Sequence, residues 1–450
     1  MQINNSETQE MGNLTFLTRA EIECLGPPTP EEIAETGISP AALRDLALKH
    51  VAALTEPTTA TVAEGLHLPL ALVDDILYQL YREKLIEIRL QSAAALTRYA
   101  MLDHGWERVA RLYQQSAYAG PAPVTLEDYT YMMRLQARPA QTASPERVRR
   151  AFSDLVLPDS LLTTLGCVIT SRSSLFLTGL PGTGKTAVAE RINAASLGAI
   201  WIPYAIQIDD QVIRVFDPHC HHLAPQANEE TEHDRRWVRI ERPMVVVGGE
   251  LTLENTDLVW SETAKFYEAP FQVKSNGGTL VVDELGRQRV SCRDLLNRWI
   301  MPLERRVDFL TLHNGKKIEV PFEQLVVFST NLNESDIVDD AFLRRMGYRA
   351  RLELPTPAAY GEIFRRAALA KGFPINESSI HYLLRKYSTE QRPMKSCEPR
   401  DLLNRISDMC VYEGRGLELS DELIDVAWQN YFGASHRFDT GMSKSFAAAL

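Results

Sequence analysis

One eight-residue segment constrains this chain more than any other. Residues 179–186 read Gly-Leu-Pro-Gly-Thr-Gly-Lys-Thr, which is a complete G-x-x-x-x-G-K-[ST] phosphate-binding loop. The segment follows an apolar run at 174–178 and precedes a helical pattern at 187–192, so a strand, a loop and a helix are expected in that order. Glycines let backbone N–H groups curl around phosphates, and the helix directs its positive end at them. The segment therefore predicts that the chain binds a nucleoside triphosphate.

The residues of this loop have expected roles. Lys185 adds a full positive charge beside the phosphates, and Thr186 supplies a hydroxyl group for Mg²⁺. A chance match on a glycine-rich turn is the alternative, and the flanking strand and helix patterns argue against it. The predicted nucleotide contacts here are Gly179, Leu180, Pro181, Gly182, Thr183, Gly184, Lys185, Thr186 and Ala187.

Length and charge narrow the remaining possibilities. A chain of 450 residues predicts two to four domains. Its 48 Lys and Arg against 59 Asp and Glu give a net charge of −11, unlike the basic excess of a general nucleic-acid-coating protein. The six cysteines have no C-x-x-C spacing, which predicts reduced thiols, and no apolar stretch approaches the roughly 18 residues of a membrane span. We expect a soluble, cytoplasmic protein.

Two further strand patterns end in polar residues that suit the same site. The run at 277–285 predicts a buried strand that ends at Asp283 and Glu284. Because open α/β sheets bind ligands at the carboxyl ends of their strands, these carboxylates are expected beside the phosphate loop. Asp283 would hold Mg²⁺, and Glu284 would polarise the attacking water. A second run, at 324–331, ends in Asn331, an amide suited to orient that water or to sense the γ-phosphate.

These ordered motifs resemble those of the AAA+ ATPase superfamily, in which Asn331 would occupy the sensor 1 position. The segment 339–345, Asp-Asp-Ala-Phe-Leu-Arg-Arg, is similar to the family's D-x-A-x-L-R-R segment. The resemblance implies that Arg344 or Arg345 reaches the γ-phosphate of a neighbouring subunit, where a guanidinium stabilises the charge of the transition state. The alternative is two surface arginines at a helix end, and the sequence does not separate the two roles.

The resemblance extends to a C-terminal helical lid. The segment 397–403, Cys-Glu-Pro-Arg-Asp-Leu-Leu, looks like sensor 2, with Arg400 as the nucleotide contact. This match is short, and Arg400 at a helix start would equally pair with Asp401 or Glu398. The implied fold is α/β, with a P-loop AAA+ parallel-sheet core and a C-terminal helical lid.

Two departures from a minimal AAA+ core narrow the resemblance to particular members of the superfamily. Asn314-Gly315, between alternating apolar residues, predicts a β-hairpin just before sensor 1, similar to the helix-2-insert and MoxR-type members. The Gly-Ala-Phe-Thr-Gly-Ala loop of enhancer-binding activators is missing, which argues against that function. The long stretch 207–268 predicts a strand and an insertion near the central pore of a ring. This stretch contains His219, His221 and His222, which crowd one turn, and His233 further on. Because there is no second spaced pair of ligands, zinc is not favoured.

The N-terminal part has a different pattern. Three helical patterns between Pro40 and Leu80 precede two strand patterns, at 84–90 and 98–102, which resembles a small winged-helix α+β domain. Its eight Lys and Arg against nine Asp and Glu over 40–115 favour a protein-interaction role over DNA binding, although both stay open. The expected divisions are a polar tail at 1–40, the winged-helix-like domain at 41–118, a linker at 119–150, the ATPase core at 151–354, the lid at 355–435 and a tail at 436–450.

The predicted function is Mg²⁺-dependent ATP hydrolysis at the subunit interfaces of a homo-oligomeric ring, expected to be a hexamer, which remodels an unidentified protein client. ATP and the ring follow from the resemblance alone. The alternative is an ATP-regulated DNA-binding protein whose winged helix reads duplex DNA.

Overall fold

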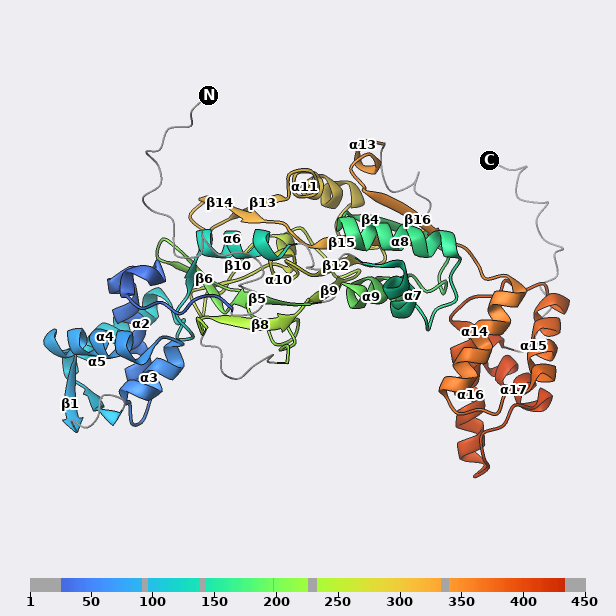
Figure 1. Ribbon diagram of the computed structural model, residues 1–450, viewed down its shortest axis with the longest axis horizontal. Helices are drawn as coiled ribbons and strands as arrows, with labels where there is room; N and C mark the ends of the chain where they lie inside the picture. Colours follow the sequence, from blue (N-terminus) through green and yellow to red (C-terminus); the bar gives the residue numbers. More distant parts are fainter. Residues whose placement is uncertain are drawn as a thin grey trace, which may run out of the picture.

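The computed structural model describes residues 26–90, 96–137, 143–196, 198–225, 233–332 and 340–433. Figure 1 shows an elongated molecule with four parts in a row. A small helical unit lies at one end, a β-rich unit follows, then a parallel sheet between helices, and a bundle of helices lies at the far end. The elements of the β-rich unit come from distant parts of the sequence. They lie together between the helical unit and the parallel sheet (Figure 1).

The parallel sheet positions the predicted site. Its strands are β4 (Leu175–Gly179), β9 (Met244–Val247), β12 (Thr279–Val282), β15 (Leu325–Thr330) and β16 (Tyr348–Leu352). Their order is β16-β4-β15-β12-β9, and every neighbouring pair is parallel. Strands β12 and β15 are buried at every residue, as expected for the apolar central strands of a sheet covered on both faces. The covering helices include α7 (Pro145–Ala151), α8 (Asp159–Ser171), α9 (Lys185–Ala195) and α11 (Cys292–Arg305).

The lid is a bundle of four helices: α14 (Pro357–Ala370), α15 (Glu377–Thr389), α16 (Glu398–Tyr412) and α17 (Asp421–Phe432). Side chains of Thr356, Asn376 and Ser420 cap three of these helices by accepting a backbone N–H bond in the first turn. Buried aromatic residues from three helices fill the bundle. The parallel sheet, the phosphate loop and the lid confirm the predicted α/β fold class, a P-loop parallel-sheet core followed by a C-terminal helical lid. The expected tail at 436–450 lies outside the described residues.

The N-terminal unit has the elements expected for a winged helix. It comprises α2 (Pro40–Ala53), α3 (Thr59–Leu66), α4 (Leu70–Arg82), β1 (Ile86–Leu90), β2 (Arg98–Met101) and α5 (Asp103–Gln115). The strands β1 and β2 form an antiparallel pair. The apolar positions that recur along α2 and α4 are buried together in one core.

A β-rich unit, whose extent the sequence did not indicate, lies between the N-terminal unit and the parallel sheet. One mixed sheet has the order β10-β11-β7-β6-β3, and two antiparallel pairs, β5 with β8 and β13 with β14, join it around a shared core. Its strands are β3 (Val124–Thr125), β5 (Ala199–Pro203), β6 (Ala205–Ile208), β7 (Gln211–Arg214), β8 (Trp237–Glu241), β10 (Val259–Trp260), β11 (Tyr267–Glu268), β13 (Val307–Thr311) and β14 (Lys317–Pro321). The short helices η4 (Glu254–Thr256) and α10 (Phe271–Lys274) accompany them. The predicted hairpin is β13 and β14, with Gly315 at φ +83° in its turn.

Two expected boundaries need correction. The segment 119–150 is not a simple linker, because α6 (Leu126–Gln136) packs Tyr129 and Met132, both fully buried, into the core of the β-rich unit. The described end of the expected tail, from Gly26 on, is also folded onto this unit. It includes η2 (Ile33–Thr36), and the buried Arg236 donates to the carbonyl oxygen of Thr36 at 2.9 Å. This proline-containing segment has few apolar residues, yet they are sufficient to pack it onto the β-rich unit.

Among the described residues, no helix is both long and apolar enough to cross a membrane.

Candidate nucleotide site

The phosphate loop, the two predicted strand ends and the start of α16 surround one cavity of about 540 Å³. This follows from the sheet order, because β15 lies between β4 and β12 and all three carboxyl ends meet at one edge. The residues that line the cavity are Asp154, Leu155, Val156, Leu157, Pro181, Gly182, Thr183, Gly184, Lys185, Thr186, Ala187, Val188, Glu190, Asp283, Glu284, Asn331, Ile363, Ser396, Cys397 and Arg400.

The loop has the backbone shape that its glycines predict. Gly182 and Gly184 have φ angles of +84° and +96°, in the left-handed region that residues with a Cβ atom rarely adopt. Gly184 directly precedes α9, so the positive end of that helix faces the cavity. Gly179 and Leu180 belong to the loop but are not among the cavity-lining residues. Their carbonyl oxygens instead accept hydrogen bonds from Lys185 Nζ, at 2.8 and 3.1 Å.

Lys185 is held at the mouth of the loop. Only 8% of the residue is exposed, and this burial lowers the pKa of its ammonium group, while the carboxylates of Asp283 and Glu284 oppose the shift. A phosphate group bound in the loop would offer this desolvated ammonium a stronger acceptor than two backbone carbonyls.

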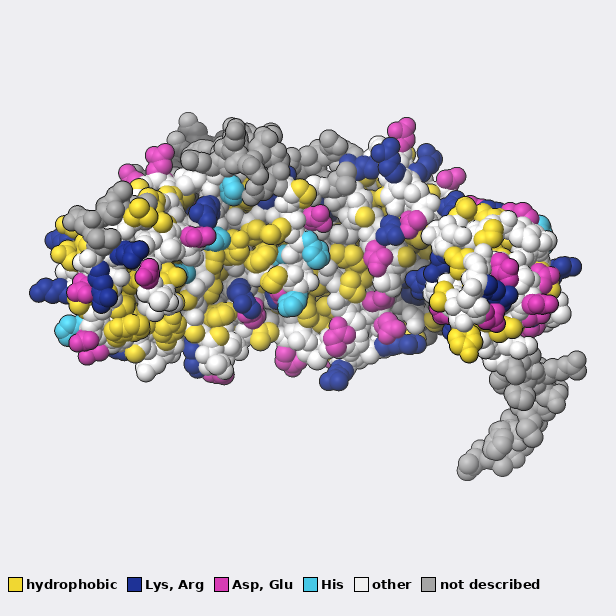
Figure 2. Space-filling model, turned by 90° about the horizontal axis from the view of Figure 1, so that it is seen from below, with side chains coloured by type: hydrophobic (Ala, Val, Ile, Leu, Met, Phe, Trp, Pro, Cys, Tyr) yellow, Lys and Arg dark blue, Asp and Glu magenta, His cyan; other side chains and the backbone are white. Residues whose placement is uncertain are grey.

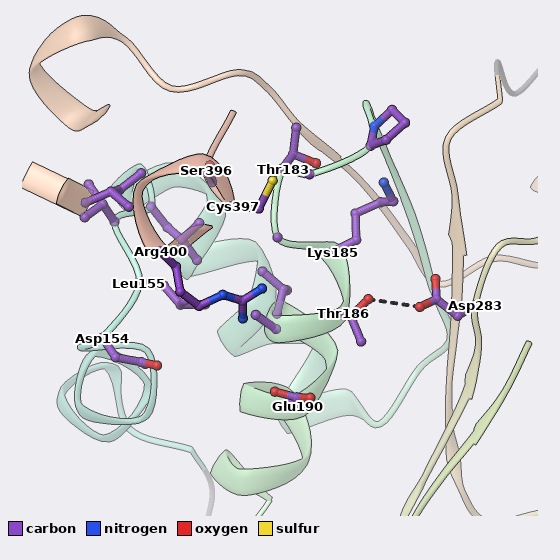
Figure 3. Close-up of a pocket in the computed structure, with 18 of the residues that line it drawn as sticks. Asp154, Leu155, Thr183, Lys185, Thr186, Glu190, Asp283, Ser396, Cys397 and Arg400 are labelled. Carbon is purple, nitrogen blue, oxygen red and sulfur yellow. Dashed lines mark hydrogen bonds between the residues drawn. The ribbon is translucent and has the colours of Figure 1, made fainter. Parts of the chain in front are cut away.

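The side chains of Thr186 and Asp283 are hydrogen-bonded to each other. The Thr186 hydroxyl donates to Asp283 Oδ2 at 2.9 Å, the bond drawn as a dashed line in Figure 3. Mg²⁺ prefers oxygen ligands and takes one or two from the protein, the rest from phosphate and water. A threonine hydroxyl and a carboxylate in contact beside a phosphate loop fit this ion, so the donor set is suited to Mg²⁺.

Glu284 lies just beyond β12 in a strained conformation. Its φ angle is +52°, which costs a residue with a side chain on the order of 1–3 kcal/mol. Neighbouring hydrogen bonds hold the turn: Glu284 N–H donates to Asp283 Oδ1 at 2.9 Å, and Leu285 N–H donates to the carbonyl of Ser329 at 2.8 Å. The second bond ties the turn after β12 to the end of β15. The turn that carries Glu284 is therefore bonded to the end of the strand that precedes Asn331.

The lid closes the cavity from the opposite side. Cys397 N–H donates to the carbonyl oxygen of Gly182 at 3.1 Å, so the start of α16 is bonded to the phosphate loop itself. Figure 3 shows Arg400 reaching from α16 into the cavity towards α9. Its Nε atom also lies 3.6 Å from Asp401 Oδ1, but the Arg400 side chain is 71% exposed, so this ion pair contributes little to stability. Arg400 therefore lines the cavity, as predicted for a nucleotide contact, and it also pairs with Asp401, as the alternative prediction stated.

A buried hydrogen-bonded chain fixes the start of α16. Tyr360 donates to the Tyr387 hydroxyl at 2.7 Å, and Tyr387 donates to Glu398 Oε2 at 2.7 Å. The same Glu398 oxygen accepts from the backbone N–H of Lys395 at 2.9 Å. Glu398 is only 2% exposed, and burial raises the pKa of Tyr387 well above its ordinary range, with further contributions from Tyr360 and Glu398. These residues hold the turn that brings Cys397 and Arg400 to the cavity.

Arg344 and Arg345 do not line the cavity of their own chain. They follow the short helix α13 (Asp340–Leu343), and Arg344 is exposed. Arg345 Nε lies 2.6 Å from Glu304 Oε1 on α11. Asp339, the first residue of the predicted segment, lies outside the described residues.

The histidine segment has a structural arrangement. His221 is buried, its Nδ1 accepts from Asp217 N–H at 3.0 Å, and its Nε2 lies 2.8 Å from the Lys274 carbonyl oxygen. Both ring nitrogens are thus engaged, and burial lowers the pKa of the ring. The ring of His233 packs on Trp201 instead, at 4.7 Å between centroids. In the described part of the chain, no group of three or more His, Cys, Asp or Glu is arranged to hold a metal ion.

Fold and site together define a class: a P-loop α/β protein with a helical lid. A family model described as a domain of unknown function, DUF8689, matches residues 356–430, which is the lid. No curated protein matches the sequence. A crystal structure of NtrX from Brucella abortus in complex with ADP is similar over 62% of this chain and 56% of that chain, with 18% identity and a TM-score of 0.38. The chain therefore spans just over half of the NtrX chain.

A second similar structure is the Thermotoga maritima RuvB Holliday junction branch migration motor. It covers 67% of this chain and 76% of that chain, with 16% identity and a TM-score of 0.35. The class rests on the sheet order and on the residues of the cavity.

Several cavity residues had no signal in the sequence. Residues 154–157, between α7 and α8, and Ile363 on α14 line the cavity without belonging to any motif. Cys397 and Ser396 belong to the turn before Arg400, and only their proximity to that predicted contact pointed to them. Nonlocal packing of the lid on the core brings these residues together.

Proposed function

We propose that this protein is an AAA+-type ATPase that binds ATP with Mg²⁺ and hydrolyses it. The observation that carries the proposal is the convergence of Lys185, the Thr186–Asp283 pair, Glu284 and Asn331 on one cavity. A phosphate-binding loop alone supports binding. A carboxylate and an amide at the strand ends beside it supply what an attacking water needs, so hydrolysis is supported as well.

Each group has a distinct part in the proposed reaction. The loop backbone and Lys185 bind and orient the phosphates, and Arg400 neutralises charge from the lid side. Mg²⁺ bound by Thr186 and Asp283 would offset the negative charge that develops during transfer. Glu284 accepts the proton of the attacking water, and Asn331 orients that water in line with the leaving group.

The positions of Arg344 and Arg345 support assembly of the protein into an oligomer. Neither Arg344 nor Arg345 lines the cavity of its own chain, and Arg344, directly after α13, is exposed. A guanidinium supplied by a second subunit would complete the transition-state charge balance, which makes hydrolysis dependent on assembly. We infer a homo-oligomeric ring, with a hexamer as the expected size.

The surface of α4 supports a protein client over DNA. In a winged helix this helix would enter the groove, yet its exposed side chains include Tyr78 at 57% and Tyr81 at 42%, together with Asp75. Arg82 at its end is its single basic residue. On the face drawn in Figure 2, basic and acidic side chains are interspersed over the molecule. DNA binding requires a basic surface that follows phosphates, so recruitment of a protein client through this aromatic and acidic face is the better-supported role.

The experiment is a comparison of Glu284→Gln with wild type. The variant should bind a fluorescent ATP analogue with unchanged affinity, while its phosphate release should fall by at least about 100-fold, because the general base is lost. Glu319→Gln, at an exposed position of the hairpin strand β14 and outside the cavity, is the matched control and should hydrolyse ATP normally. Undiminished turnover in Glu284→Gln would show that this carboxylate is not the base.

A further inference from the structure

The end of helix α16 is an exposed apolar projection outside the nucleotide site. Val411 and Tyr412 are 73% and 91% exposed, the highest values among large hydrophobic side chains in the described residues. Gly414, at φ +66°, turns the chain directly after them. Figure 1 shows this end of α16 extending beyond the other lid helices. Water-exposed side chains of this size in the last helical turn are suited to an anchor for another surface.

A second feature matches a tyrosine side chain in size. A cavity of about 380 Å³ lies between α7 and α8, with Val148, Leu162, Gly166 and Tyr348 in its wall. Cys167, an exposed free thiol, also lines it. A cavity of this size accommodates one aromatic side chain, and tyrosine buried in a pocket is a frequent anchor of protein interfaces.

The charges around the two features are also complementary. Helix α7 carries three arginines, at 147, 149 and 150, against the single Glu146, and Arg149 lines the cavity. The segment 408–418 around the projection carries three acidic residues, Asp408, Glu413 and Glu418, against the single Arg415. Helix α7 thus has a net charge of +2, which Asp159 in the cavity wall reduces to +1, whereas the segment around the projection has a net charge of −2. Opposite net charges favour association of the two surfaces.

We propose that Tyr412 of one copy of this chain inserts into the cavity between α7 and α8 of a second copy. The end of α16 points away from α7 and α8 of its own chain in Figure 1, so the contact is between copies. Because the two surfaces differ, the contact is head-to-tail, the type that closes into a ring. The inference rests on the proposed function, in that it names a contact for the assembly that the arginines require.

The contact also has a route to the nucleotide. Residues 154–157 connect α7 to α8 and line the nucleotide cavity. A neighbour seated between these helices therefore adjoins a segment that lines the nucleotide cavity, so assembly would respond to whether the site is filled.

Cross-linking tests the contact directly, because the cavity already contains a thiol. Full-length Tyr412→Cys, mildly oxidised in the presence of ATP and Mg²⁺, should form a ladder of covalent dimers and larger multimers through Cys167 of the next copy. The ladder should disappear on reduction and in Tyr412→Cys/Cys167→Ser. Leu369→Cys, at an exposed apolar lid position (59%), is the matched control and should form no ladder. A ladder that persists without Cys167, or a cross-link confined within one chain, would overturn the contact.

A second measurement keeps the inference apart from the proposed function. Tyr412→Ser should weaken self-association in sedimentation by at least about tenfold, whereas Leu369→Ser should not, since loss of a buried tyrosine anchor typically has an effect of this size. Both positions are exposed, so both variants should fold. Concentration-dependent ATP hydrolysis by wild type, with normal assembly of Tyr412→Ser, would refute this contact and leave the ATPase intact. A wild type that assembles but hydrolyses nothing would refute the ATPase alone.

Discussion

Gly182 lies where the phosphate loop meets the lid, and substitution there tests how the two are coupled. A Cβ atom added to Gly182 would lie 2.7 Å from Cys397 Sγ and 3.4 Å from Lys395 Cδ. The φ angle of +84° adds strain of roughly 1–2 kcal/mol for an alanine. The 2.7 Å contact forces Cys397, at the start of the lid helix α16, to shift, and overpacking of this kind costs about 1–3 kcal/mol. We expect Gly182→Ala to weaken ATP binding by roughly 5- to 100-fold, because Arg400 moves with the lid.

The measurement is a double-mutant cycle with a fluorescent ATP analogue. Cys397→Ala removes the sulfur atom that the new Cβ would meet, so the Gly182→Ala/Cys397→Ala variant should recover most of the lost affinity, with a coupling energy of about 1 kcal/mol or more. Gly184→Ala separates strain from contact: its φ angle is +96°, yet an added Cβ has no atom within 4 Å. Thermal unfolding of Gly184→Ala without nucleotide should show a loss of stability from backbone strain alone, because the added Cβ makes no contact. An equal affinity loss with and without Cys397 would refute the argument that this contact couples loop and lid.

Three further predictions follow from the site and its supports. Thr186→Ala removes the hydroxyl that bonds Asp283 and should raise the Mg²⁺ concentration for half-maximal ATPase activity by roughly tenfold or more, measured by metal titration; an unchanged requirement would count against this metal position. Tyr387→Phe removes a donor from the buried Glu398 and should lower the free energy of unfolding by about 1–3 kcal/mol in urea titrations. Burial lowers the pKa of His221, so the unfolded chain binds its proton more readily and stability falls as the pH drops below about 6.5. His221→Asn should therefore lose less stability than wild type between about pH 7.5 and 5.5 in melting experiments.

Much of the fold was predictable because its signals are local. The phosphate loop depends on glycines at fixed offsets, and the strands that end at Asp283 and Asn331 are continuous apolar runs. The hairpin at Asn314-Gly315 needs a left-handed glycine, which the sequence supplies. Patterns of this kind are readable because a few adjacent residues determine the backbone conformation.

The β-rich unit was not predictable in the same way. Its strands are two to five residues long and come from segments as distant as β3 and β14. Short strands carry little periodicity, and their pairing depends on partners far away in the chain. The helix α6 has a weak apolar pattern, so the segment 119–150 read as a linker although Tyr129 is fully buried.

The sequence by itself determined the chemical groups of the site: a phosphate loop, a hydroxyl, two carboxylates, an amide and several candidate arginines. Tertiary structure decided which of these act together. The parallel order β4-β15-β12 brings Asn331 and Asp283 to the loop, and the lid adds Arg400 and Cys397. It leaves Arg344 at the surface and engages both nitrogens of His221 in hydrogen bonds. The physical reason is that residue identity fixes charge and hydrogen-bonding capacity, whereas distance between side chains depends on strand order and packing over the whole chain.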